Sequence, residues 1–191
     1  MPLPQTHFEP SSSYEDALHR AAEEWGIVRE FWDIFGHRHV ASAEIEAKIL
    51  SSLCVDVTNQ ETVECDRIRL FLGRVGIVLP PTSVIDEDHK ELFLSIPSGL
   101  QPVVHLELTT EHGGQLVFHY EYQALTAIHE YHQGDNHWTS YRLTLPPEIP
   151  LGYHKASITL EGIAPVVEGR VIVCPTQAYL PADLTNGGST A

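Results

Sequence analysis

The chain has 191 residues, of which 42% are hydrophobic and 19% charged, and its formal net charge is −15. This length and composition describe a folded globular protein of one or two domains, and the excess of acidic residues excludes nucleic acid and anionic membrane surfaces as partners. No apolar run approaches the ~20 residues of a transmembrane helix, and no basic N-terminal stretch precedes an apolar one, so we expect neither a membrane span nor a signal peptide.

Residues 1–76 are expected to form a helical N-terminal segment, after an irregular lead-in of ten residues that contains three prolines. Ser12 and Ser13 are typical helix N-caps, and the apolar residues after them recur with helical spacing until Gly26. This stripe consists of Tyr14, Ala17, Leu18, Ala21, Ala22 and Trp25. The pattern predicts an amphipathic helix that ends at the glycine.

Two more helices are expected before residue 77. Ser42 is another N-cap, and the pattern after it predicts a helix whose buried face carries Ile45, Ile49 and Leu53. A third helix is expected to hold Val63, Ile68, Phe71 and Leu72 and to close at Gly73 and Gly76. Residues 31–40 are rich in aromatic side chains, and we expect this segment to fill the gap between two helices.

Residues 77–176 are expected to form a β-sandwich. After Pro80 and Pro81 no segment has helical periodicity, and apolar residues alternate with polar ones, as in strands with one buried face. The expected strands cover 83–86, 92–96, 103–109, 115–122, 123–134, 138–145, 153–160 and 169–174. So many short strands predict an immunoglobulin-like antiparallel β-sandwich, and the fold class is α+β, mainly β. Residues 177–191, rich in Pro, Asn, Gly and Ser, are expected to be a linker or tail.

A structural corner of the sandwich is predicted at Gly152 and Tyr153. Pro150 and Gly152 are turn residues, and the tyrosine follows them at the start of a strand. This is the position of the tyrosine corner of immunoglobulin-like domains, in which the ring is buried and the hydroxyl group bonds to upstream backbone. We therefore expect Tyr153 to be mostly buried.

No catalytic residue is expected in this chain. The sequence has no GxSxG motif and no glycine-rich phosphate loop, and its acidic residues show no pair placed for acid–base chemistry. His129 and His132 lie three positions apart, which on a strand directs them to opposite faces, so they could not share one metal ion. We predict no metal site and no cofactor. The three cysteines form no CxxC pair and are expected to be reduced thiols in the cytoplasm.

Aromatic residues between positions 120 and 141 are the candidates for binding. Sugar rings stack on exposed aromatic faces, so a flat row of rings would bind a glucan. Tyr120, Tyr122 and Tyr141 share the side of their strands with aliphatic residues and are expected in the core. Trp138 and Tyr131 remain as candidate carbohydrate-binding residues. The alternative for Trp138 is packing against a neighbouring domain, where aromatic residues also concentrate.

Five stretches, taken in chain order, carry a family resemblance. They are 18–27 (LHRAAEEWGI), 31–44 (FWDIFGHRHVASAE), 78–81 (VLPP), 145–154 (LPPEIPLGYH) and 170–175 (RVIVCP). Together they resemble the N-terminal region of bacterial 4-alpha-glucanotransferases, the amylomaltases of glycoside hydrolase family 77. The resemblance covers nearly the whole chain, and the order and spacing of the stretches carry it rather than any single motif.

The resemblance implies a domain without chemistry of its own. In that family the catalytic Asp and Glu residues lie in a TIM-type barrel that follows this region, and the reaction transfers α-1,4-glucan segments between maltodextrins with retention of configuration. No residue of this chain matches those carboxylates, so we expect the 191-residue chain to be inactive alone. The implied partners are its own catalytic barrel domain, toward which residues 177–191 would lead, and α-glucans. A free-standing carbohydrate-binding module and a purely structural sandwich remain the alternatives.

Overall fold

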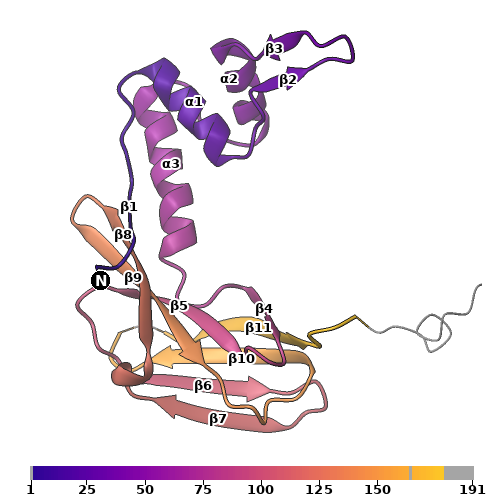
Figure 1. Ribbon diagram of the computed structural model, residues 1–191. Helices are drawn as coiled ribbons and strands as arrows, with labels where there is room; N and C mark the ends of the chain where they lie inside the picture. Colours follow the sequence, from indigo (N-terminus) through magenta and orange to yellow (C-terminus); the bar gives the residue numbers. More distant parts are fainter. Residues whose placement is uncertain (1, 164, 179–191) are drawn as a thin grey trace, which may run out of the picture. The chain divides into compact units, whose positions relative to one another are not determined.

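The computed structural model describes residues 2–163 and 165–178 of the chain (Figure 1). These residues divide into two compact units. The first unit contains the chain up to Ile77 together with His129–Trp138, and the second contains Val78–Ile128 and the chain from Thr139 onward. The boundary at Ile77 lies next to the expected one, whereas residues 129–138, which the sequence pattern places in the sandwich, are part of the first unit.

Three helices form in the first unit, as expected, because each begins at a residue that caps it. They are α1 (Tyr14–Glu24), α2 (Ala43–Ser52) and α3 (Gln60–Val75). The side chains of Ser13 and Ser42 accept hydrogen bonds from backbone N–H groups in the first turns of α1 and α2. Asn59 forms a capping box at the start of α3, which runs through Gly73 and ends at Gly76. The N-caps of the first two helices could therefore be predicted from the sequence.

The buried face predicted for α2 is wrong. Ile45, Ile49 and Leu53 are 49%, 37% and 48% exposed, whereas Glu46 and Leu50 are fully buried. The buried residues each lie one position after the predicted ones, which corresponds to a rotation of about 100° around the helix axis. The error arises because a buried carboxylate, which no apolar pattern reveals, lies on the true inner face. The core of this unit is formed by Ala17, Leu18, Ala21, Leu50, Val55 and Val63.

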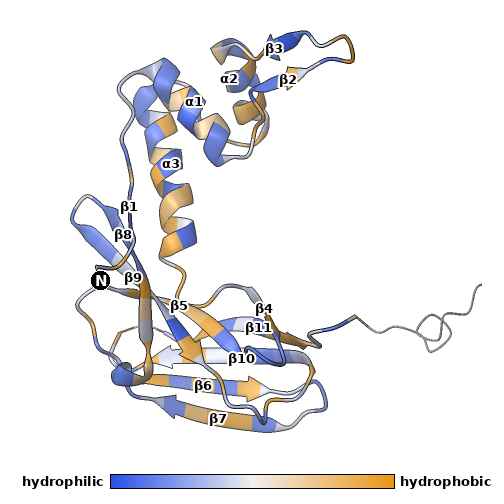
Figure 2. Ribbon diagram, in the orientation of Figure 1, coloured by the Kyte–Doolittle hydropathy of each residue, from blue (hydrophilic) through white to orange (hydrophobic). Residues whose placement is uncertain are grey.

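The aromatic segment between α1 and α2 does not fill a gap between helices, so that expectation is also wrong. It forms a two-stranded antiparallel hairpin of β2 (Glu30–Trp32) and β3 (Arg38–Val40). The backbone N–H of Gly36 donates to the carbonyl oxygen of Asp33, and Gly36 has φ +82°, which favours glycine. Figure 2 shows apolar residues at the tip of this hairpin.

The second unit contains most of a β-sandwich (Figure 1). One sheet has the strand order β4-β11-β10-β6-β7, and the other has the order β1-β8-β9-β5. The strands are β1 (Gln5–His7), β4 (Thr82–Asp86), β5 (Glu91–Pro97), β6 (Val104–Thr109), β7 (Gln115–Tyr120), β8 (Thr126–Gln133), β9 (Asn136–Thr144), β10 (Gly152–Leu160) and β11 (Val167–Cys174). A short 3₁₀ helix, Tyr122–Ala124, follows β7 where the sequence pattern extends the strand. The predicted class, α+β and mainly β with a β-sandwich, is confirmed.

The sandwich core comes from alternate residues of both sheets, because successive side chains of a strand point to opposite faces. Apolar and polar residues accordingly mix along each strand (Figure 2). From one sheet the core takes Leu92, Leu94, Ile96, Tyr141 and Leu143, and from the other Val104, Leu106, Leu108, Ala156, Ile158, Leu160, Val171 and Val173. The alternation predicted from the sequence therefore places the core correctly.

The predicted tyrosine corner is wrong. Tyr153 is 63% exposed, whereas the next residue, His154, is 1% exposed. Even-numbered residues of β10 face the core, so an odd-numbered tyrosine on that strand points outward. The buried ring at this corner is His154, whose Nε2 lies 2.8 Å from the carbonyl oxygen of Pro150. Gly152 has φ +129°, and a Cβ atom there would meet the carboxylate of Glu111, so this position requires glycine.

None of the helices in the described ranges has the length and apolar character that a membrane span requires. The three cysteines, all within these ranges, are unpaired. The linker or tail predicted for residues 177–191 lies, from residue 179 on, outside the described residues.

Candidate functional site

The two candidate carbohydrate-binding residues lie opposite each other on the β8–β9 hairpin. Tyr131 belongs to β8 and Trp138 to β9, and a two-residue turn, Gly134–Asp135, joins the strands, so the two rings are cross-strand neighbours on one face. Both side chains are half-buried. Nε1 of Trp138 is 3.7 Å from the position that a Cβ on Gly76 would take, so this ring packs beside the end of α3.

Tyr131 borders a hollow of about 320 Å³ in the first unit. The other lining residues are Thr6, Glu24, Arg67, Leu70, Phe71, Arg74 and Val75. Polar groups in its wall already have partners. Oγ1 of Thr6 lies 2.8 Å from Nε2 of His129, and Nη2 of Arg74 donates to the carbonyl oxygen of Glu24 at 2.8 Å. A sugar in this hollow would meet the rings of Tyr131 and Phe71 but gain few new hydrogen bonds.

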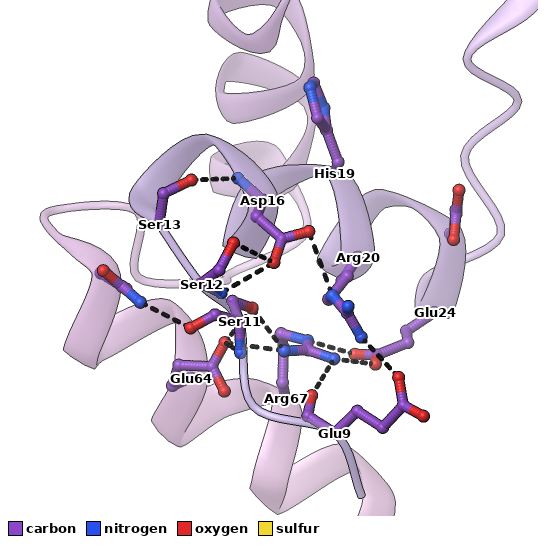
Figure 3. A network of polar contacts seen from close by, with 12 residues as sticks. Glu9, Ser11, Ser12, Ser13, Asp16, His19, Arg20, Glu24, Glu64 and Arg67 are labelled. Atoms are coloured by element: carbon purple, nitrogen blue, oxygen red, sulfur yellow. Dashed lines mark hydrogen bonds and ion pairs between the residues drawn. The ribbon is translucent and has the colours of Figure 1, made fainter.

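The guanidinium group of Arg67 connects three segments of the first unit (Figure 3). It donates to the carboxylate of Glu24 through Nε at 2.9 Å and Nη2 at 2.6 Å, and to Glu64 through Nη1 at 2.7 Å. Nη1 also donates to Oγ of Ser11 at 2.7 Å, and the cation lies 5.0 Å from the centre of the Phe8 ring. Residues 8–11 are thereby fixed to α1 and α3.

This network stabilises the fold and does not bind a ligand. Arg67 is 2% exposed, and all five of its N–H donors reach protein oxygens, the fifth being the carbonyl oxygen of Glu9 at 3.4 Å. Burial alone would lower the pKa of the guanidinium, but its hydrogen bonds to Glu24 and then to Glu64 raise that pKa. A permanently charged group with no free donor offers neither acid–base chemistry nor a contact for a substrate.

A second buried ion pair lies at the root of the β2–β3 hairpin. Glu46 on α2 is fully buried, and its Oε1 accepts a hydrogen bond from Nε of Arg29 at 2.5 Å. Its Oε2 contacts Nδ1 of His19 on α1. Arg29 immediately precedes β2, so the pair fixes the start of the hairpin to α2. Sequence reasoning missed this site because its three members come from separate segments.

Three histidines from separate strands cluster in the first unit, with His7 stacked on His132 and His137 edge-on to it. The ring of His132 on β8 lies 4.5 Å from that of His7 on β1 and 4.5 Å from that of His137 on β9. Nδ1 of His132 contacts Nδ1 of His137, and its Nε2 is buried without a hydrogen-bond partner. Burial, and then the charges of His137 and His7, lower the pKa of His132 from its ordinary 6.5. Within the described ranges no cluster of His, Cys, Asp and Glu is suited to a metal ion.

We expect the first unit to lose stability as the pH falls below about 6.5, the ordinary pKa of histidine. The pKa of His132 is lower in the folded chain, so between the two values the unfolded chain binds more protons and is favoured as the pH falls. Melting curves at about pH 7.5 and about pH 5.5 test this sign. His132→Phe keeps a stacked ring but cannot titrate, and it should lose less stability than wild type.

His112→Gln is the control for this comparison, because His112 is an exposed histidine in the turn between β6 and β7. It should retain the pH dependence of the wild type. If His132→Phe and His112→Gln lost equal stability on acidification, the cluster of His7, His132 and His137 would not be the source of that loss.

A shallow groove of about 470 Å³ lies on the outer face of the β4-β11-β10-β6-β7 sheet. Its charged lining residues are Glu107, Lys155, Glu168 and Arg170. Both signs of charge are present and no aromatic ring lines it, so it lacks the stacking surface on which sugar binding commonly rests.

Three well-exposed aromatic rings lie on the β2–β3 hairpin. Phe31, Trp32 and Phe35 are 61%, 65% and 78% exposed. The sequence analysis missed this surface because three-residue strands are too short for a period-2 pattern. Asp33 and Gly36, which make the turn between two apolar stretches, are the signal that could have revealed a hairpin.

Comparison with known proteins gives a family match and a fold match. The family model described as the MalQ N-terminal beta sandwich domain matches residues 78–175. The crystal structure of amylomaltase from Corynebacterium glutamicum matches with a TM-score of 0.57 and 21% sequence identity, covering 84% of this chain and 23% of that chain. At this identity the likeness shows the fold alone. The chain spans about a quarter of the length of that amylomaltase.

A second solved structure is a family 123 glycoside hydrolase from Clostridium perfringens. Its TM-score is 0.27 and its sequence identity 10%, over 53% of this chain and 24% of that chain, which is too low a similarity to carry an argument. No curated protein matches the sequence.

Proposed function

This chain belongs to the family of MalQ N-terminal beta sandwich domains, and from that premise we propose that it is the non-catalytic N-terminal part of an amylomaltase-type 4-alpha-glucanotransferase. The parent reaction would transfer α-1,4-glucan segments between maltodextrins with retention of configuration, using a carboxylate pair in a separate catalytic barrel domain. The family match over residues 78–175 is the observation that carries the proposal. The fold match to an amylomaltase of about four times this length supports it.

The state of the acidic residues supports a role without catalysis. Retaining glycosidases need two carboxyl groups about 5 Å apart that face a substrate. Glu46 is paired with Arg29 and His19, and Glu24 and Glu64 are paired with Arg67. The described hollows are bordered by carboxylates that already serve as structural partners, such as Glu24, or that lie beside lysine and arginine. We propose that this domain positions or supports the catalytic domain in the cytoplasm.

We also assign the sandwich to the immunoglobulin-like type, which the strand order supports. A sheet of β5, β9 and β8 faces a sheet of β6, β10 and β11. This corresponds to strands B, E and D facing strands C, F and G of an immunoglobulin domain. This fold by itself does not decide the function, so the role proposed above rests on the family match and on the state of the acidic residues.

A free-standing carbohydrate-binding module is the competing function, and we expect only weak glucan binding. Tyr131 and Trp138 share one face of a hairpin, but both are half-buried, and one or two partly covered rings must offset the freedom lost on binding. We expect a Kd in the millimolar range or no binding, about −4 kcal/mol or weaker. Titrating maltoheptaose against wild type, Trp138→Ala and Tyr131→Ala by calorimetry or NMR measures it. Micromolar binding lost in either variant would favour the module.

The proposed function is tested by expressing the complete reading frame that contains these 191 residues. Its product should disproportionate maltotriose into glucose and longer maltodextrins. A complete product without that activity would reject the amylomaltase assignment.

A further inference from the structure

The β2–β3 hairpin exposes a group of apolar side chains. Besides Phe31, Trp32 and Phe35, Ile34 is 93% exposed and Val40 is 55% exposed. Single exposed apolar residues are normal on a protein surface and need no explanation. Five of them on one eleven-residue hairpin form a patch, and such patches mark interaction surfaces. The apolar tip can be followed in Figure 2.

Hydrogen bonds hold the hairpin in one shape. Oδ1 of Asp33 accepts from the backbone N–H groups of Phe35 at 2.8 Å and His37 at 2.9 Å. Its Oδ2 lies 3.1 Å from a ring nitrogen of His37 and 3.1 Å from one of His39. The buried Glu46 pair fixes the root. A side-chain patch on such a preorganised element loses little conformational freedom on binding, which favours a specific interface.

The apolar residues lie on both faces of the hairpin. The register pairs Phe31 with His39 and Trp32 with Arg38. Neighbouring residues of a strand point to opposite faces, so the rings of Phe31 and Trp32 are on opposite sides. Two such rings cannot form one flat platform for a glucan. A groove that receives the hairpin from both sides would cover them together with the tip.

The hairpin is electrically neutral on an acidic chain. The chain carries −15, whereas Arg29 and Arg38 balance Glu30 and Asp33 within residues 29–40. A neutral apolar tip suits an apolar groove. A second copy of this chain is a poor occupant, because a tip inserted into a groove elsewhere on the copy makes a head-to-tail contact, which builds rings or filaments. Two chains of −15 also repel each other.

We propose that the β2–β3 hairpin docks this domain into an apolar groove of the catalytic region of an amylomaltase-type enzyme. The inference rests on the proposed function, because it takes that region as the occupant. An amylomaltase is long enough to include such a catalytic region beside this domain, because the matching fold covers only 23% of the C. glutamicum amylomaltase. Since hairpin and groove would belong to one polypeptide, their effective concentration is high, and a contact as small as one hairpin suffices.

Hydrogen exchange of the hairpin amides tests the proposal. The product of the complete reading frame is compared with the chain of residues 1–191. Amides of β2 and β3 should exchange at least about tenfold more slowly in the complete product, because docking suppresses local opening. Ile34→Asp combined with Phe35→Asp should remove this protection. Phe93→Asp is the matched control, since Phe93 is 47% exposed on the sandwich, and it should leave the protection intact.

Equal exchange in the complete product and in the 191-residue chain would overturn the proposal. Protection of the chain alone by maltoheptaose would overturn it in favour of a glucan site. A concentration-dependent dimer that the double variant abolishes would overturn it in favour of a second copy. Failure of the proposed function is visible separately, as a complete product that does not disproportionate maltotriose. If the hairpin amides were protected in a complete product that does not disproportionate maltotriose, the partner would not be the catalytic region of an amylomaltase-type enzyme.

Discussion

Replacing Arg67 with alanine should lower the free energy of unfolding of the first unit by about 3–5 kcal/mol, the usual cost of removing one partner from a buried ion pair. The side chain is 2% exposed, and its loss leaves the carboxylates of Glu24 and Glu64 without a cation. It also releases residues 8–11, which Arg67 holds through Ser11 and the ring of Phe8. This is a large fraction of the ~5–15 kcal/mol that stabilises a typical domain.

Arg69→Ala is the matched control for this experiment. Arg69 lies on the same helix and also pairs with a carboxylate three residues earlier, Asp66, at 2.5 Å, but its side chain is 78% exposed. Although Asp66 is buried, it keeps the hydrogen bond from the backbone N–H of Asp56 when Arg69 is removed. Because the Arg69 side of the pair is exposed to water, its loss should cost only about 1 kcal/mol. Urea unfolding followed by circular dichroism should separate the two variants. Equal midpoints for Arg67→Ala and Arg69→Ala would contradict the assignment of Arg67 as the structural centre of this unit.

Replacing Ile158 with alanine should destabilise the sandwich by about 2–5 kcal/mol, because a buried isoleucine loses its transfer free energy and leaves a cavity. Ile158 is fully buried on β10, where it pairs with Leu106 on β6 and Val167 on β11. Both neighbouring strands hold its backbone in place, so the site has little freedom to collapse around the missing atoms. The measurement is the midpoint of chemical unfolding of the second unit.

Tyr153→Ala on the same strand is the informative comparison. A buried tyrosine corner would lose about 3–5 kcal/mol on truncation, whereas a residue that is 63% exposed should lose no more than about 0.5 kcal/mol. Near-wild-type stability of Tyr153→Ala beside a strongly destabilised Ile158→Ala is therefore expected. The reverse order would restore the tyrosine corner and reject the outward orientation of Tyr153.

Local signals in the sequence predicted most elements of this fold. Ser13 and Ser42 are helix caps that act within one turn, so they could be recognised without knowledge of distant residues. The strands were found because alternation over five or more residues reflects one buried face. Leu92, Leu94 and Ile96 illustrate this, since all three are in the core as predicted.

One error arises where distant segments decide the outcome, and another where a local signal was overlooked. Glu46 can be buried because Arg29 and His19, which belong to other segments, pair with it. The buried face of α2 is therefore one residue away from the face predicted from Ile45 and Ile49. Tyr153 was assigned from its place after a turn, although its parity on β10 already opposed the assignment. Trp138 and Tyr131 were chosen because the alternation of the strands places the other aromatic residues in the core. That these two rings share one face of a hairpin depends on the exact position of the turn between β8 and β9, which the sequence alone did not determine.

The decisive experiment is a maltotriose disproportionation assay, run side by side on the 191-residue chain and on the product of its complete reading frame. We propose that this chain belongs to an amylomaltase-type enzyme but carries none of its chemistry. The complete product should therefore release glucose and longer maltodextrins, while the chain alone should give no more than a control without protein. Glucose and longer maltodextrins formed by the purified 191-residue chain would contradict it.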